Sequence, residues 1–226
     1  MIEIQNLYKR YHNHHGSDWV LEDINLTIPT GVSVGLVGQN GAGKSTLLKL
    51  IGDMDVPDRG QIIRHSSVSW PIGLSGGFQP GLSGRQNVKF VARVHGGESL
   101  VAPTIEFVQS FSELGDSFDE PVRTYSAGMR SRLAFGLSLA FDFEVYLSDE
   151  ATAVGDALFR QKASQAFKDR VGQASLIMVS HAEGILKELC TAGIWLHEGQ
   201  AHWFDDIHEA LKAYKAFRDQ KQAKKI

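Results

Sequence analysis

The sequence predicts an α/β fold built on a largely parallel sheet, and three short apolar segments support this prediction. Val32–Val37 runs into a glycine-rich turn, Val145–Leu147 into Ser-Asp-Glu, and Leu176–Val179 into Ser-His. Continuous apolar segments of this length, separated by helical stretches, are typical of strands buried on both faces of a parallel sheet. Because ligands bind beyond the carboxyl ends of such strands, we expect the polar residues that follow all three to meet at one site.

Composition limits the class of protein. The chain has 226 residues, of which 42% are apolar and 22% charged, and its net charge is −3. This size predicts one domain or one domain with an inserted lobe. The balance of charge argues against binding to nucleic acid. Cys190 is the single cysteine, which excludes an internal disulfide. The chain has neither a long apolar run nor an export signal at its start, so we expect it in the cytoplasm, reaching the membrane through a partner.

A mainly helical lobe is predicted over residues 82–140. It follows the segment Gly73–Gly84, which holds five glycines and is interpreted as a joint. Helical patterns follow at Asn87–Val94 and Ile105–Leu114, where apolar residues recur at helical spacing.

The remaining chain is assigned to the sheet domain and its ends. Residues 2–28 alternate between apolar and polar, which predicts antiparallel strands, and residues 205–226 have the pattern of an amphipathic helix. We therefore expect a single domain, 1–226, with a core formed by 1–81 and 141–204.

The turn after Val37 has the phosphate-loop pattern, in which Gly and four residues precede Gly-Lys-Ser. Small residues let successive backbone N–H groups approach a polyphosphate. The lysine supplies a cation, the serine a hydroxyl for Mg²⁺, and the helix that starts there directs its positive end at the anion. An ordinary glycine-rich turn is the alternative interpretation. The pattern predicts a P-loop NTPase whose nucleotide-binding residues are Gly38, Gln39, Asn40, Gly41, Ala42, Gly43, Lys44, Ser45 and Thr46.

Two carboxylates follow the second apolar segment, Val145–Leu147, and they narrow the predicted reaction to hydrolysis of the nucleotide. Asp149 at the tip of a neighbouring strand is placed to hold Mg²⁺, and Glu150 directly after it is placed to polarise an attacking water. A solvated charge at a strand end is the alternative for Glu150. We interpret the pair as that of an ATPase.

Between the loop and the acidic strand lies Tyr125–Arg130, with the sequence Tyr-Ser-Ala-Gly-Met-Arg. Ser126 is a suitable N-cap for a helix predicted over Met129–Phe141. This segment resembles the Leu-Ser-Gly-Gly-Gln signature of ABC-transporter ATPases. The resemblance implies that family's architecture, a RecA-like core with an N-terminal antiparallel β subdomain and an inserted helical subdomain.

The resemblance also assigns roles to residues outside the phosphate loop. Gln79 resembles the glutamine between the two lobes, which would join Ser45 and Asp149 in holding Mg²⁺, and His181 resembles the switch histidine. Asp156 matches the family's D-loop aspartate. Tyr11 resembles the aromatic residue that stacks on adenine, although Tyr8 and Trp19 lie nearby. The implied catalytic set is Glu150, His181 and Gln79.

In this family two copies of the chain sandwich two ATP molecules. The resemblance implies a homodimer in which Ser126 and Gly128 of one copy contact the nucleotide bound by the other. Departures from the signature, Ala127 for glycine and Met129 for glutamine, remove one side-chain amide from that contact.

The stretch Trp70–Gln79, together with further departures from the family pattern, makes the sequence resemble the branch that exports bacterial capsular and other cell-surface polysaccharides. The resemblance implies a separate membrane permease and a place on the cytoplasmic face of the inner membrane. The end at Ile226, without an added carbohydrate-binding domain, favours a capsule-type system. Export of O-antigen or teichoic acid, a non-transport ABC ATPase, and a module that binds ATP without hydrolysing it are the alternatives.

Overall fold

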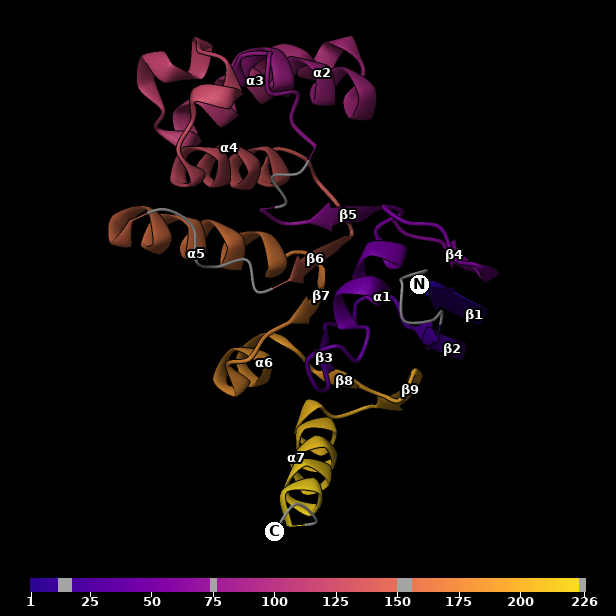
Figure 1. The fold of residues 1–226 in the computed structure, drawn as a ribbon. Helices are drawn as coiled ribbons and strands as arrows, with labels where there is room; N and C mark the ends of the chain where they lie inside the picture. Colours follow the sequence, from indigo (N-terminus) through magenta and orange to yellow (C-terminus); the bar gives the residue numbers. More distant parts are fainter. Residues whose placement is uncertain (12–17, 74–76, 150–155, 224–226) are drawn as a thin grey trace. The chain divides into compact units, whose positions relative to one another are not determined.

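The computed structural model describes residues 1–11, 18–73, 77–149 and 156–223. The predicted base Glu150 and part of the glycine-rich segment, 74–76, lie outside these residues. Contacts divide the chain into two compact units (Figure 1). The sheet unit comprises Met1–Trp70, Phe143–Glu150 and Ala174–Ile226, and the helical unit comprises Pro71–Asp142 and Ala151–Gln173.

The sheet unit begins with the antiparallel pair that the alternating pattern predicts. β1 (Ile2–Arg10) pairs with β2 (Trp19–Ile28), so that Ile2 lies opposite Ile28. A third strand, β4 (Arg59–Arg64), pairs with the other edge of β1 and gives the order β2-β1-β4. This strand was not predicted.

A six-stranded sheet forms the centre of the sheet unit, in the order β5-β6-β7-β3-β8-β9. The pairs β6–β7, β7–β3 and β3–β8 are parallel, as the apolar segments predict, whereas β8–β9 is an antiparallel hairpin. The strands are β3 (Val34–Val37), β5 (Val68–Pro71), β6 (Val145–Asp149), β7 (Ser175–Val179), β8 (Ala192–His197) and β9 (Gln200–Phe204).

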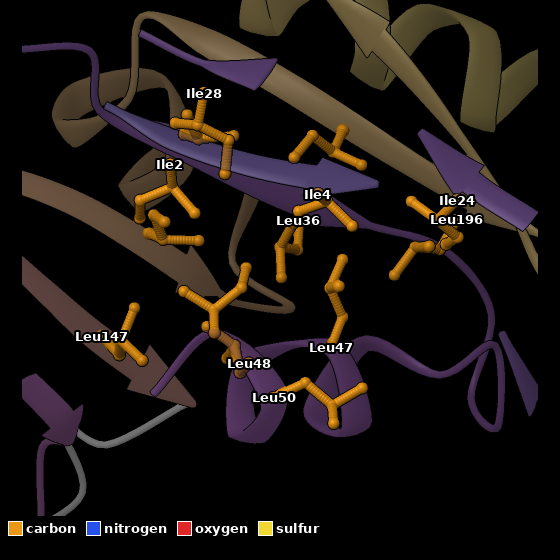
Figure 2. Packing of buried hydrophobic residues seen from close by; sticks show 14 of the residues in the cluster. Ile2, Ile4, Ile24, Ile28, Leu36, Leu47, Leu48, Leu50, Leu147 and Leu196 are labelled. Atoms are coloured by element: carbon orange, nitrogen blue, oxygen red, sulfur yellow. The ribbon is translucent and has the colours of Figure 1, made fainter. Parts of the chain in front are cut away.

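Helix α1 (Lys44–Ile51) is held by the core of the sheet unit. Figure 2 shows Leu47 and Leu48 among isoleucines of β1 and β2 and leucines of β3, β6 and β8, all within one buried cluster. Leu47, Leu48, Leu50 and Ile51 are all fully buried. Because burial of each such side chain stabilises the fold by about 1.5–3 kcal/mol, this packing fixes the helix and the loop that precedes it.

The helical unit contains α2 (Gly84–Gly96), α3 (Val101–Ser112), α4 (Ala127–Leu139) and α5 (Ala157–Val171). Short 3₁₀ turns lie at Glu98–Leu100, Gly115–Asp119 and Val122–Thr124. The helices predicted from the sequence are present, but α3 ends before Leu114. Its end follows from Glu113, whose φ of 53° is left-handed and cannot continue the helix.

Two more helices belong to the sheet unit, α6 (Glu183–Leu189) and α7 (Ile207–Ala223). The latter is the predicted C-terminal helix, and it packs on β8 (Figure 1). A side chain on Gly193 of β8 would collide with Ala210. In the described part of the chain, no helix combines the length and the apolarity that crossing a membrane requires.

Candidate active site

The phosphate loop connects β3 to α1, and its backbone shape depends on glycine. Gly38, Gly41 and Gly43 have φ values of 153°, 81° and 94°, which L side chains rarely adopt. A Cβ on Gly38 would lie 2.5 Å from the carbonyl oxygen of Leu196, and one on Gly43 would lie 2.8 Å from Leu21 Cδ2. The loop is therefore pressed against β8 on one side and β2 on the other.

Lys44 closes this loop from inside. It is only 9% exposed, and its Nζ donates hydrogen bonds of 2.9 Å to the carbonyl oxygens of Gly38 and Gln39. The first N–H groups of α1 begin at the same residue, since Gly43 is the N-cap. The first-turn N–H groups of a helix have no intrahelical acceptor, so cation and helix dipole act together on an anion placed here.

The three strand ends meet, as predicted. In the sheet register Val179 of β7 lies opposite both Asp149 of β6 and Leu36 of β3. A cavity of about 440 Å³ lies at these ends. Its lining residues are Tyr11, Val20, Asn40, Gly41, Gly43, Lys44, Ser45, Thr46, Asp149, Val179 and His181.

This cavity gathers most of the site residues predicted within the sheet unit. Asp149 is half-buried, whereas Ser45 and His181 are exposed. Gln39 and Ala42 line an adjoining cavity of about 680 Å³, together with Lys221 of α7, which donates a 3.1 Å hydrogen bond to Gln39 Oε1. The sequence did not predict this contact of α7.

Of the three aromatic residues that were considered, Tyr11 is the one that lines the 440 Å³ cavity with Lys44 and Asp149. Tyr8 and Trp19 pack edge to face at 5.2 Å, and neither lines that cavity. The Tyr11 hydroxyl donates a 2.9 Å hydrogen bond to Asp55 Oδ2, and burial is the largest of the effects that raise its pKa above the usual value. Asp55 and its partner Lys9 were missed by sequence analysis, because a charged residue in a loop gives no periodic signal.

The helical unit carries the segment that resembles the signature. Ser126 caps α4 as predicted, and its Oγ accepts a 3.1 Å hydrogen bond from the N–H of Met129. Ser126, Gly128, Arg132 and Asp156 line a cavity of about 480 Å³.

Asp156 is held firmly in that cavity. It caps α5 by accepting a hydrogen bond from the N–H of Phe159, and it forms an ion pair with Arg132. The Phe159 N–H and then the Arg132 cation lower the pKa of Asp156 below its usual value, against the effect of desolvation. Arg132 is a further residue that sequence analysis missed.

Gln79 also lies in the helical unit, where its backbone is fixed. Its N–H donates a 2.8 Å hydrogen bond to Asn87 Oδ1, and Asn87 Nδ2 donates in return to the Gln79 carbonyl oxygen at 3.2 Å. The Gln79 residue is exposed. The buried Asn87 of α2 thus anchors the residue that the sequence assigns to the joint.

A buried strand, a glycine loop closed by lysine, and an acidic residue at the tip of a nearby parallel strand define a P-loop nucleotide-binding protein. The family model described as "ABC transporter" matches residues 21–153, and the chain belongs to this family. It is therefore an ATPase of the ABC type, as the resemblance implied.

Curated relatives match over nearly the whole chain. The polysialic acid transport ATP-binding protein KpsT of Escherichia coli is 52% identical over 216 residues, covering 95% of this chain and 99% of the relative. BexA, an ATP-binding protein of Haemophilus influenzae, is 41% identical, and the match covers 95% of this chain and 98% of the relative. The capsule polysaccharide export ATP-binding protein CtrD of Neisseria meningitidis serogroup B is 39% identical, and the match covers 96% of this chain and 99% of the relative.

Among solved structures, the dimeric post-hydrolysis state of the ATP-binding cassette MJ0796, bound to ADP and Pi, has the same fold. Its TM-score is 0.72 at 21% identity, with 92% of this chain and 99% of that chain covered. This likeness confirms the predicted ABC ATPase architecture.

Proposed function

We propose that this chain hydrolyses ATP to drive export of a capsular or other cell-surface polysaccharide through a separate membrane permease. The observation that supports this most directly is the cavity in which the phosphate loop, Asp149, His181 and Tyr11 come together. Membership of the ABC transporter family supports coupling to transport, and the names of the relatives support the class of cargo.

The phosphates of ATP would bind the N–H groups of Gly41 to Ser45 and the ammonium of Lys44. A Mg²⁺ ion fits the oxygen donors beside them, since Ser45 and Asp149 line one cavity and hard cations prefer hydroxyl and carboxylate oxygens. Bound there, the ion neutralises charge on the β- and γ-phosphates. Gln79 is the further ligand that the family resemblance suggests.

Glu150 would accept a proton from the attacking water, whose oxygen then bonds to the γ-phosphorus as the bond to the ADP oxygen breaks. Glu150 directly follows Asp149 in the sequence, and this adjacency is the basis of the assignment. His181 would donate a hydrogen bond to the γ-phosphate, because it lines the same cavity as Lys44.

Two copies of the chain would complete each site. Ser126 is exposed at the start of α4, and among the described residues an added Cβ on Gly128 would meet only Ser126 Oγ, at 3.8 Å. Helix N-termini bind phosphate oxygens readily, so this surface suits the γ-phosphate held by a second copy. ATP then favours the closed dimer, and hydrolysis favours its separation.

Because no described helix is suited to crossing a membrane, attachment to the cytoplasmic face of the inner membrane would come through the permease. O-antigen and teichoic acid remain alternative cargoes. Deletion of the gene should leave polysaccharide inside the cell. Accumulation of O-antigen or teichoic acid instead of capsule would change the cargo assignment.

The enzymatic part of the proposal is tested with purified protein. Glu150→Gln should abolish phosphate release while ATP still promotes dimerisation, and Ser126→Arg in that background should abolish dimerisation. Phosphate release at the wild-type rate from Glu150→Gln would refute the assigned base. Dimerisation that persists in Ser126→Arg would refute the contact between copies.

A further inference from the structure

A polar network joins the aromatic side chain of the site to the loop that follows α1. Asp55 in that loop accepts a 2.9 Å hydrogen bond from the Tyr11 hydroxyl on Oδ2 and a 2.7 Å hydrogen bond from Lys9 Nζ on Oδ1. Lys9 Nζ also donates to the Val56 carbonyl oxygen at 2.7 Å. Tyr11 is thus held through its own oxygen and not only through packing.

In the pair of Lys9 and Asp55, the lysine is buried and the carboxylate is half-buried. Lys9 is 8% exposed, and a lysine buried to this degree requires a partner for its charge. Burial alone would raise the pKa of Asp55, but the hydrogen bonds from Lys9 and Tyr11 outweigh it, and the pKa lies below its usual value. The carboxylate is therefore ionised at neutral pH and remains a strong acceptor for both donors.

The network also fixes the plane of the Tyr11 ring. Lys9 Nζ lies over this ring, 5.1 Å from its centroid, so one face is directed toward the ammonium. Tyr11 is nevertheless 45% exposed and lines the cavity of Lys44 and Thr46. A cation on one face and exposure elsewhere leave the opposite face for a flat ligand.

The same loop is tied to β1 at a second point, which makes the anchor rigid. The N–H of Arg10 donates to Asp58 Oδ2 at 2.8 Å, and the N–H of Asp58 donates to the Tyr8 carbonyl oxygen at 2.9 Å. Since this loop directly follows α1, whose first turn lies at the phosphates, the ring of Tyr11 is positioned relative to the phosphate loop.

We propose that Asp55 is a positioning residue for the nucleotide base: it orients the Tyr11 ring, with Lys9 on the far face, so that adenine stacks at a set distance from the phosphate loop. This inference rests on the stacking of adenine on Tyr11 that the family resemblance implies. Asp55 itself does not touch the nucleotide.

The test compares two ligands that share the phosphates and differ in the base. Isothermal titration calorimetry would measure binding of the full chain to the non-hydrolysable analogue adenosine 5′-(β,γ-imido)triphosphate and to inorganic tripolyphosphate, both with Mg²⁺. Loss of base stacking weakens binding by about 5- to 150-fold, so Tyr11→Ala should lose this much for the analogue alone. Asp55→Asn removes the charge and one of the two acceptor oxygens and so weakens the hold on the ring; it should lose about three- to tenfold for the analogue and nothing for tripolyphosphate.

Asp53→Asn is the matched control, because it makes the same change of charge in the same loop. Asp53 is exposed and has a left-handed φ of 58°, which asparagine tolerates, and its ion-pair partner is Arg64 at 3.3 Å. This variant should bind both ligands as the wild type does. Tyr11→Phe keeps the ring but removes the hydroxyl, and with it the hydrogen bonds with both Asp55 and Thr46; it is the second test variant. It should bind the analogue at least as weakly as Asp55→Asn, and the double variant should be no weaker than Tyr11→Phe.

The outcomes separate the two proposals. If Tyr11→Ala weakens the analogue but Asp55→Asn and Tyr11→Phe do not, the positioning role of Asp55 is wrong and the base platform stands. If Tyr11→Ala has no selective effect, the proposed function of Tyr11 is wrong. Equal losses for both ligands in Asp55→Asn would mean that the pair with Lys9 only supports the fold, which overturns the inference.

Discussion

Alanine at two glycines of the phosphate loop should give different losses of stability, although both glycines have positive φ. At Gly41, with φ of 81°, an added Cβ meets no atom of the described residues within 4 Å. At Gly38, with φ of 153°, the Cβ would lie 2.5 Å from the carbonyl oxygen of Leu196 in β8. The first substitution strains only the backbone, whereas the second also forces the loop away from the sheet.

The magnitudes follow from these two contributions. A left-handed L residue costs about 1–2 kcal/mol, so Gly41→Ala should lower the unfolding free energy by that amount. Gly38→Ala carries about 1–3 kcal/mol of backbone strain and about 1–3 kcal/mol for the collision, because a backbone oxygen cannot rotate away as a side chain would. In a chain of this length, 1 kcal/mol lowers the Tm by about 2–4 °C.

Thermal and urea unfolding without nucleotide, followed by circular dichroism, would measure both losses. Because the collision adds about 1–3 kcal/mol, Gly38→Ala should unfold about 2–12 °C below Gly41→Ala. The ATP affinity of the two variants can also be compared, because Gly41 lines the 440 Å³ cavity at the phosphate loop and Gly38 does not. If the two variants were equally stable, the close packing of the loop against β8 would be refuted.

Three further predictions concern other parts of the fold. Arg64→Met should cost about 1.5–3 kcal/mol in urea unfolding, since the guanidinium donates to the carbonyl oxygens of Leu50 and Ile51 at the end of α1. Burial raises the pKa of Cys190 to about 12 from a usual 9.0, so the folded state binds this proton more tightly. Stability should fall by about 1.4 kcal/mol per pH unit between pH 9 and 12, and Cys190→Ala should lack this component. Gly128→Ala should raise the Tm by about 1–4 °C, because alanine favours a helix, yet weaken ATP-dependent dimerisation measured by gel filtration.

The fold was predictable where a strand or helix shows its burial in its own sequence. β3, β6 and β7 each contain a short apolar run, are buried over almost their whole length and were found, whereas β4 is exposed over its first half and has no alternation. Its pairing comes from the edge of β1 and not from its own residues. The β8–β9 hairpin did carry a local signal, because Glu198 and Gly199 form its turn with φ of 47° and 77°, a pattern typical of two-residue hairpins.

The residues of the candidate site likewise divide into those that a local pattern predicts and those that only the fold brings together. The phosphate loop was predicted because its requirements are local, namely the spacing of glycines and one lysine before a helix. The contacts of Asp55 with Lys9 and Tyr11 join residues more than 40 positions apart, and only the pairing of β1 with the chain after α1 brings them together. No sequence pattern within either segment predicts such a contact.

The glycines of the two proposed half-sites are under different constraints. Those of the phosphate loop are required by this chain's own backbone, through positive φ and through contact with β8 and β2. Gly128 lies in the first turn of α4, where no described atom other than Ser126 Oγ comes near an added Cβ, and glycine costs up to about 1 kcal/mol relative to alanine in a helix. Gly136 in the same helix differs, since its Cβ would lie 3.2 Å from Phe111. A cost at Gly128 that the chain's packing does not require is consistent with close approach by a second molecule. In the proposed dimer, backbone N–H groups at the start of α4 would supply that contact, so the side chains of Ala127 and Met129 would not need to match the usual signature.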